Sequence, residues 1–269
     1  MEQRNDDGPS RALPRCPTRH ARVHSAQQLG DNIVLLSMKL SHGSTVRFLA
    51  GQSVRIQLPD GSAHTLAVAN APGRTGVASI DVHLGIRERS MPHRQAGEPP
   101  RVVLVPPVQA EVQIDGPFGD FYWRDEGNQP VVLIASDAEF APLKSMVEHA
   151  LGQHDQRPLH IYWGVGTQDE LYLHGLVQSW VENNDHIYYT PVLRAPRPAS
   201  SWHGRTGDAC DALIEDLPDL SPYRIYLSAD SRGGDVLRQR LIGDAHADPD
   251  ELFISWRHST TQTNKGSFK

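Results

Sequence analysis

The hydrophobic pattern of this chain changes once, near Pro130, and that change constrains the fold more than any other feature. Before it, from His20 to about Tyr122, apolar residues come in short runs separated by turn-forming stretches such as PDGS and APGRTG. Runs of this length and spacing are typical of antiparallel strands in a barrel or a sandwich. The sequence therefore predicts an all-β domain over residues 20–122.

After Pro130 the pattern alternates between strands and helices. The run VVLIAS predicts a strand, and the residues after it predict a helix because their apolar positions recur at i, i+3, i+4, i+7 and i+8. Pro142 fits the first turn of that helix, where its missing N–H is not needed. With these two included, five strands and four helices alternate, which predicts a parallel sheet covered on both faces over residues 130–258.

Length and charge exclude several classes of protein. The 269 residues are enough for two hydrophobic cores, and a net charge of -6 argues against a nucleic-acid partner. No run of about 20 apolar residues predicts a membrane span, and the N-terminus lacks a secretory signal, so we expect a cytoplasmic protein. Residues 1–19 and 259–269 are polar and lack periodicity, which predicts disordered tails.

Cysteine and histidine patterns argue against a resident metal. Cys16 and Cys210 are the only two cysteines, too few for a four-thiolate iron–sulfur cluster. The 14 histidines form no HExxH or comparable array, so we expect no metal site. Neither a GxSxG elbow nor a GxxxxGK[ST] loop occurs, which leaves hydrolase and P-loop functions without support.

Five short segments carry a resemblance to a known family. They are GPFGDF at 116–121, FAPLKSM at 140–146, YWG at 162–164, DELY at 169–172 and WHGRTG at 202–207. With the predicted order of domains, they resemble the ferredoxin–NADP reductase superfamily, in the branch of NAD(P)H–flavin reductases and CDP-glucoseen reductase. The resemblance implies a six-stranded antiparallel FAD-type barrel followed by a five-stranded parallel sheet of the NAD(P)-binding type.

The flavin motif of that family is only partly present. Asn70 opens the expected Asn-Ala-Pro turn, but His64 stands where the family has a phosphate-binding arginine. Leu66 replaces the stacking aromatic residue, and Ala67 replaces the serine that hydrogen-bonds the flavin ring. A protonated His64 would hold a phosphate in part; the alternative is a polar residue on a barrel strand. Likewise, the arginines within residues 87–101 form either a phosphate-gripping loop or a solvated surface loop.

The nicotinamide turn has lost its glycines. The family's Gly-Gly-Thr-Gly turn reads SDAE at 136–139, so Asp137 and Glu139 stand beside the expected phosphate site. One such charge about 5 Å from a phosphate charge costs roughly 3 kcal/mol at an effective dielectric of about 20. The alternative is that these residues cap the following helix. The residues after Gly164 carry no arginine for a 2′-phosphate, which favours NADH over NADPH.

Two further segments lie where the family has cofactor-binding turns. The turn after strand YRIYLSA lacks the family's Cys-Gly-Pro-Pro, and Cys210 does not replace it because it falls within a predicted helix. The segment WHGRTG either lines the cleft or only fixes the turn into the next helix.

The resemblance supplies candidate cofactor-binding residues and two hypotheses of function. The candidates are Asn70, His83, Pro117, Gly119, Ala141, Pro142 and Gly164. In the first hypothesis, the protein passes electrons from NAD(P)H through FAD or FMN to a flavin or protein acceptor, with no iron–sulfur cluster of its own. In the second, a relative with weak or no cofactor binding acts as a binding or regulatory subunit of a partner enzyme.

Overall fold

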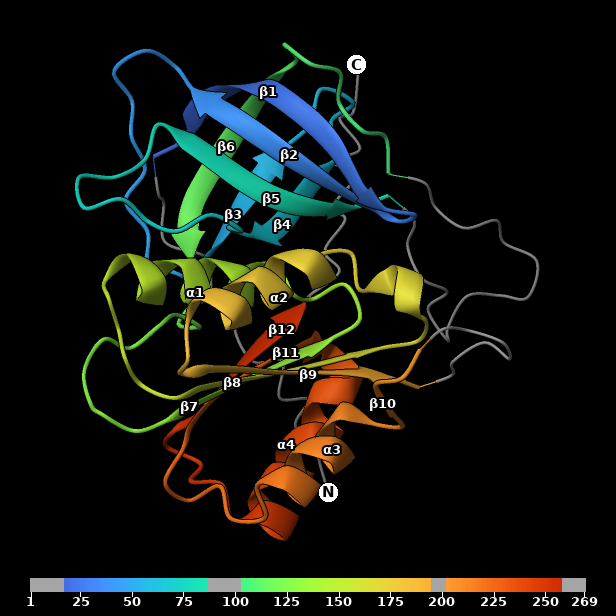
Figure 1. Ribbon diagram of the computed structural model, residues 1–269. Coiled ribbons are helices and arrows are strands. Elements are labelled where there is room, and N and C mark those ends of the chain that lie inside the picture. The colour runs from blue at the N-terminus through green and yellow to red at the C-terminus, as the bar shows by residue number, and fades with distance from the viewer. Residues whose placement is uncertain (1–16, 87–102, 195–201, 258–269) are drawn as a thin grey trace, which may run out of the picture.

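The computed structural model describes residues 17–86, 103–194 and 202–257, and it contains two sheets, one above the other (Figure 1). The upper sheet is antiparallel, with strand order β4-β3-β6-β1-β2-β5. Its strands are β1 (Arg19–Gly30), β2 (Ile33–Leu40), β3 (Ser53–Gln57), β4 (Ala63–Ala67), β5 (Ser79–Gly85) and β6 (Glu111–Phe118).

The upper sheet closes into the predicted six-stranded barrel. Val68, just after β4, forms a bridge with Val82 of β5, and the Ala69 N–H donates to the Asp81 carbonyl over 2.7 Å. Closure joins the two edge strands and encloses a core of alternating apolar residues. Residues 103–105 of the run RVVLV, also expected to be a strand, are irregular.

Two other expectations concern the ends of the barrel. The predicted N-terminal tail extends too far, because Arg19 is the first residue of β1, where it pairs with Ile114 of β6. Most of that tail, the C-terminal tail and the whole arginine-containing loop at 87–101 lie outside the described residues.

The lower sheet is parallel, with strand order β10-β9-β8-β7-β11-β12. Its strands are β7 (Val131–Ser136), β8 (Leu159–Val165), β9 (Ile187–Leu193), β10 (Arg205–Thr206), β11 (Arg224–Asp230) and β12 (Leu252–Arg257). The five predicted strands are all present. The sixth, β10, has two residues and is too short to leave a periodic signal in the sequence.

Helices cover both faces of the parallel sheet (Figure 1). Those on the barrel side are α1 (Ala141–Gly152) and α2 (His174–Asn183), and those on the far side are α3 (Ala209–Asp216) and α4 (Ser231–Ala245). Two hydrophobic clusters result, one on each face, and residues of β7 alternate between them. In the part of the chain that the structure describes, no helix is long and apolar enough to span a bilayer.

Specific contacts fix the barrel to the second domain. The Lys144 ammonium donates to the Ala69 carbonyl over 3.0 Å, and the Ser145 hydroxyl donates to the Asn70 carbonyl over 2.8 Å. A methyl group added at Gly51 of the barrel would lie 2.4 Å from Met146 of α1, so that position needs glycine. The turn after β4 is therefore held against α1.

Candidate functional site

A cavity of about 410 Å³ lies between the barrel and the second domain. The second domain contributes the turn after β7, the start of α1 and part of β12, all at the carboxyl end of the parallel sheet. Strand order reverses between β7 and β11, and open α/β sheets bind ligands at such a point. Its lining residues include Ser53, Thr65, Leu66, Ala67, His83, Glu139, Pro142, Ile254 and Ser255.

Four of the seven candidate residues line this cavity: His83, Gly119, Ala141 and Pro142. Gly119 has φ +95°, and a methyl group added there would meet nothing within 4 Å, so its backbone conformation is what requires glycine. Pro117 lies in β6, next to the lining residue Phe118. These positions surround the cavity from both domains.

Asn70 acts one step away from the cavity. Its side-chain oxygen accepts from the Asp81 N–H over 2.8 Å, and its side-chain nitrogen donates to the Ser79 carbonyl over 3.3 Å. These bonds tie the turn after β4 to β5, the strand that carries His83. Asn70 therefore positions the cavity wall.

Gly164 has a packing role in this structure. A methyl group at that position would lie 2.8 Å from the Ala209 side chain of α3, closer than side chains normally approach. Gly164 does not line the cavity. Glycine is needed there to bring α3 onto the sheet.

The β4 strand presents a different set of side chains from the family motif. Thr65 lines the cavity beside Leu66 and Ala67, a role that sequence analysis missed. His64 is not among the lining residues, and its Nε2 lies 3.1 Å from the Ser62 hydroxyl. Residues 65, 66 and 67 are consecutive and all line the cavity, so strand alternation alone does not predict which residues of β4 do so.

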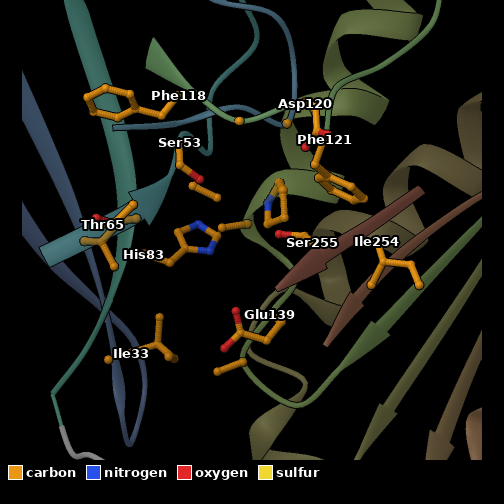
Figure 2. Close-up of a pocket in the computed structure, with 18 residues that line it drawn as sticks. Ile33, Ser53, Thr65, His83, Phe118, Asp120, Phe121, Glu139, Ile254 and Ser255 are labelled. Atoms are coloured by element: carbon orange, nitrogen blue, oxygen red, sulfur yellow. The ribbon is translucent and has the colours of Figure 1, made fainter. Parts of the chain in front are cut away.

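His83 is the buried polar residue of the cavity wall, with 6% of its surface exposed. Figure 2 shows its ring near the centre of the lining residues, between Thr65 of the barrel and Glu139 of the second domain. Its Nδ1 lies 3.1 Å from the Tyr172 hydroxyl, and its buried Nε2 has no hydrogen-bond partner among the described residues. Burial, with a smaller contribution from the Lys144 charge, lowers the pKa of His83 to about 3.

The turn after β7 keeps the shape of a glycine turn. Asp137 has φ +54°, a left-handed conformation that aspartate tolerates better than most residues. Its N–H donates to the Gly164 carbonyl over 2.7 Å, and its own carbonyl accepts from the Trp163 indole over 2.9 Å. The backbone turn therefore survives the loss of its glycines.

The charge of Asp137 is neutralised by Arg194, the residue after β9. The guanidinium forms an ion pair with the Asp137 carboxylate across the end of β8. The prediction that Asp137 repels a phosphate counted this carboxylate as unpaired, and the ion pair with Arg194 weakens that repulsion. Arg194 was missed because the two residues lie 57 positions apart.

The alternative prediction, that Asp137 and Glu139 cap the following helix, was wrong. The helix begins at Ala141, its N-cap residue Phe140 makes no side-chain cap, and its first turn holds no acidic residue. Asp137 lies too far from the helix start, and its carboxylate is engaged by Arg194.

The turn after β8 is closed by its own side chains. The Glu170 carboxylate accepts from the backbone N–H of Gly166 over 2.7 Å and of Thr167 over 3.3 Å. These amides are therefore occupied by an internal anion. The segment WHGRTG does not line the cavity; the Trp202 indole donates to the Arg205 carbonyl over 3.0 Å and shapes the turn.

Nothing in the described residues indicates a metal or a reactive thiol. Over residues 17–86, 103–194 and 202–257, no group of three or more His, Cys, Asp or Glu side chains is placed to hold a metal ion. Cys210 is buried in α3, and burial raises its pKa to about 11. It is packed in the core and does not line the cavity.

The lining residues fit the ring system of a flavin. Apolar side chains such as Leu66, Pro142 and Ile254 suit the faces of a planar ring, and a buried His83 nitrogen without a partner suits a polar ring edge. No lysine or arginine is among the described residues that line the cavity. The fit therefore applies to the ring, and the described lining offers no cation for a flavin phosphate.

Comparisons with known proteins agree with this geometry. The family model of the oxidoreductase NAD-binding domain matches residues 133–229. The CDP-6-deoxy-L-threo-D-glycero-4-hexulose-3-dehydrase reductase of Yersinia pestis is 32% identical over 210 residues, which are 76% of this chain and 58% of that protein. The NAD(P)H-flavin reductase of Vibrio harveyi is 24% identical over 237 residues, 88% of this chain and 97% of that protein.

A solved structure shows the same architecture. The cytochrome P450 reductase GcoB of Amycolatopsis superposes with a TM-score of 0.72 at 22% identity, covering 89% of this chain and 70% of GcoB. A barrel joined to an NAD-binding-type domain, with a cavity between them, defines the class of two-domain reductase folds. In sequence the chain is similar to these reductases, and in fold it resembles the ferredoxin–NADP reductase superfamily, as its motifs predicted.

Proposed function

We propose that this protein is an oxidoreductase that passes electrons from NAD(P)H, through a flavin in the interdomain cavity, to a flavin or protein acceptor. The observation that carries the proposal is the place and lining of the cavity. It lies at the switch point of an NAD-binding-type sheet, it has walls from both domains, and its lining residue His83 has a buried Nε2 without a partner among the described residues. When bound, the flavin would accept a hydride and release electrons to the acceptor.

The chain's own residues would bind and orient the ring. Leu66 and Pro142 would supply apolar contact from the barrel and from α1. Gly119 and Ala141 leave room because neither carries a bulky side chain. Asn70 and Gly164 would act indirectly, by fixing the turn after β4 and the position of α3.

NADH is the proposed donor in preference to NADPH. The backbone amides of Gly166 and Thr167 are engaged by the Glu170 carboxylate, and no cation follows Gly164 within that turn. This turn would therefore repel an added 2′-phosphate through the nearby carboxylate.

The acceptor is proposed as a free flavin or a separate protein. One relative is named as a flavin reductase, and another as the reductase of a dehydrase. The chain spans 58% of the length of the Yersinia relative, so the activity of that whole protein does not transfer directly. A partner-binding role without cofactors loses its electrostatic argument, because Arg194 neutralises Asp137.

The test is a cofactor titration followed by an activity assay. The protein, freed of cofactors, is titrated with FAD and with FMN while visible absorbance is recorded, and NADH oxidation is then measured with a one-electron dye as acceptor. We expect flavin binding and NADH oxidation that requires both protein and flavin. A protein that binds neither flavin would overturn the proposal.

A further inference from the structure

We propose that Nε2 of His83 accepts a hydrogen bond from an N–H group at the edge of the bound flavin ring, and that Tyr172 and Ala138 hold His83 in the tautomer that makes this bond. The inference rests on the proposed function, because it takes a flavin ring as the occupant of the cavity. It adds the atom, its proton state and the ligand group that it selects.

The hydrogen bonds of Tyr172 determine which nitrogen of His83 carries the proton. The Tyr172 hydroxyl lies 3.2 Å from the Ala138 carbonyl, which can only accept, and 3.1 Å from His83 Nδ1. A hydroxyl has one proton, so both bonds form only when Tyr172 donates to Ala138 and His83 Nδ1 donates to Tyr172. In a neutral imidazole with Nδ1 protonated, Nε2 carries a lone pair and accepts.

The ring is neutral under ordinary conditions. His83 is buried, and burial together with the neighbouring Lys144 charge keeps its pKa far below its usual value. Lys144 itself is engaged by Glu148 and by the Ala69 carbonyl. A lining residue of the cavity thus carries a buried acceptor without a partner among the described residues, and such an atom is unfavourable until a donor arrives.

The chemistry of the acceptor limits the ligand group. A carbonyl oxygen placed against Nε2 would bring two acceptor lone pairs together, which is unfavourable. A ring N–H would instead donate a hydrogen bond to Nε2. The oxidised flavin ring has one N–H, at N3, and the reduced ring gains another at N5. His83 is therefore suited to the N–H edge of the ring.

The arrangement also connects the two domains. His83 belongs to β5 of the barrel, Tyr172 lies between β8 and α2, and Ala138 belongs to the turn after β7. The rings of His83 and Tyr172 meet edge to face, with centroids 5.4 Å apart. The tautomer is set only when the barrel and the second domain are docked together.

The experiment uses riboflavin, which has the ring without a phosphate, and 3-methylriboflavin, which lacks the N3–H. Flavin fluorescence gives the affinity of the full chain and its variants. His83→Leu removes the acceptor and should weaken riboflavin binding about tenfold. His83→Gln, which keeps an acceptor oxygen, should recover most of that loss, and Tyr172→Phe should weaken binding by a smaller factor.

Control measurements distinguish loss of the His83 hydrogen bond from a non-specific effect of substitution on the fold. His160 lies at the amino end of β8 and does not line the cavity, so His160→Leu should leave riboflavin affinity unchanged. The wild-type protein should prefer riboflavin to 3-methylriboflavin, and His83→Leu should lose that preference. A preference that survives in His83→Leu, with a loss of affinity for the reduced flavin alone, places the bond at N5–H and supports the proposal.

The overturning results are equally specific. Equal riboflavin affinity in the wild type, His83→Leu and His83→Gln, for both oxidised and reduced ring, excludes the bond. Histidine ¹⁵N NMR of the ligand-free protein reads the tautomer directly, and a protonated Nε2 would also exclude it. If riboflavin binds as described but NADH does not reduce it, the proposed function fails while this inference stands.

Discussion

The barrel side of the cavity wall and the turn after β7 lie close together, but they differ in whether their polar groups have partners. In the cavity wall, His83 Nε2 is buried without a partner among the described residues. In the turn, the Asp137 carboxylate is paired with Arg194, and the amides after β8 are paired with Glu170. One region holds an unsatisfied acceptor, and the other satisfies its charges internally.

The difference concerns what a ligand must do in each region. A ring that enters the cavity would satisfy His83 without breaking an existing bond. A dinucleotide phosphate at the turn must compete with Asp137 for Arg194, and an arginine fork binds carboxylate and phosphate alike. We therefore expect flavin binding to depend mainly on shape and one hydrogen bond, and dinucleotide binding to depend on salt.

The largest expected effect comes from filling the cavity. Ala67→Trp places an indole among the lining residues and should weaken riboflavin binding more than about hundredfold, because the ring and the indole compete for one space. Ala67→Ser is the matched control and should bind normally. Fluorescence titration measures both variants, and unchanged binding by Ala67→Trp would place the flavin elsewhere.

A second prediction concerns the packing role of Gly164. Gly164→Ala should lower the free energy of unfolding by about 2 kcal/mol, because the added methyl group would overlap the Ala209 side chain. Gly175→Ala meets no atom within 4 Å and serves as the control, with a stability equal to or above the wild type. Urea unfolding measures both. A Gly164→Ala variant with unchanged stability but weakened NADH binding would show that Gly164 acts in cofactor binding and not in packing.

The third prediction uses the lowered pKa of His83. Between its folded pKa of about 3 and an unfolded pKa of about 6.5, the unfolded chain binds a proton that the folded protein does not. Stability contributed by the neutral ring is therefore complete above about pH 6.5 and is lost as the pH falls. At pH 5.5 the loss is about 1 kcal/mol.

Urea unfolding at pH 8 and pH 5.5 measures this loss. The wild type should lose about 1 kcal/mol more than His83→Leu or His83→Gln between these pH values. Equal losses in all three proteins would show that His83 takes up a proton in the folded state as readily as in the unfolded chain.

The smallest effect is expected at the ion pair, which is partly exposed to solvent and therefore screened. Arg194→Ala should weaken NADH binding about fivefold, because it removes a positive charge from the turn that faces the dinucleotide phosphate. Asp137→Asn should bind NADH at least as well as the wild type. Calorimetry at low and high salt measures both variants, and tighter binding by Arg194→Ala would mean that the pair obstructs the dinucleotide.

Periodicity predicted the larger elements because each buries a repeated apolar face. The five main strands of the parallel sheet and its four helices lie where the sequence placed them, whereas β10 has two residues and no period. Family motifs led to His83 and Pro142, which line the cavity. Asp137 shows the limit, because the charge that decides its effect belongs to a residue 57 positions away.

Local patterns also failed where two explanations shared the same residues. Asp137 and Glu139 stand where helix caps are common, yet the helix begins later, at Ala141. Thr65 was overlooked beside the expected motif positions, and strand alternation does not single it out, because Leu66 and Ala67 line the cavity with it. Tertiary pairing and the exact start of an element determine such roles, and neither is written in a local window of sequence.

The central claim is that the interdomain cavity holds a flavin within reach of a dinucleotide bound at the sheet edge. Its most direct test is an anaerobic titration of the flavin-loaded protein with NADH while the visible absorbance of the flavin is followed. We expect one equivalent of NADH per protein to bleach the visible absorbance of the bound flavin, and we expect no bleaching with Ala67→Trp. A flavin that binds in the wild type but keeps its absorbance in excess NADH would contradict the account.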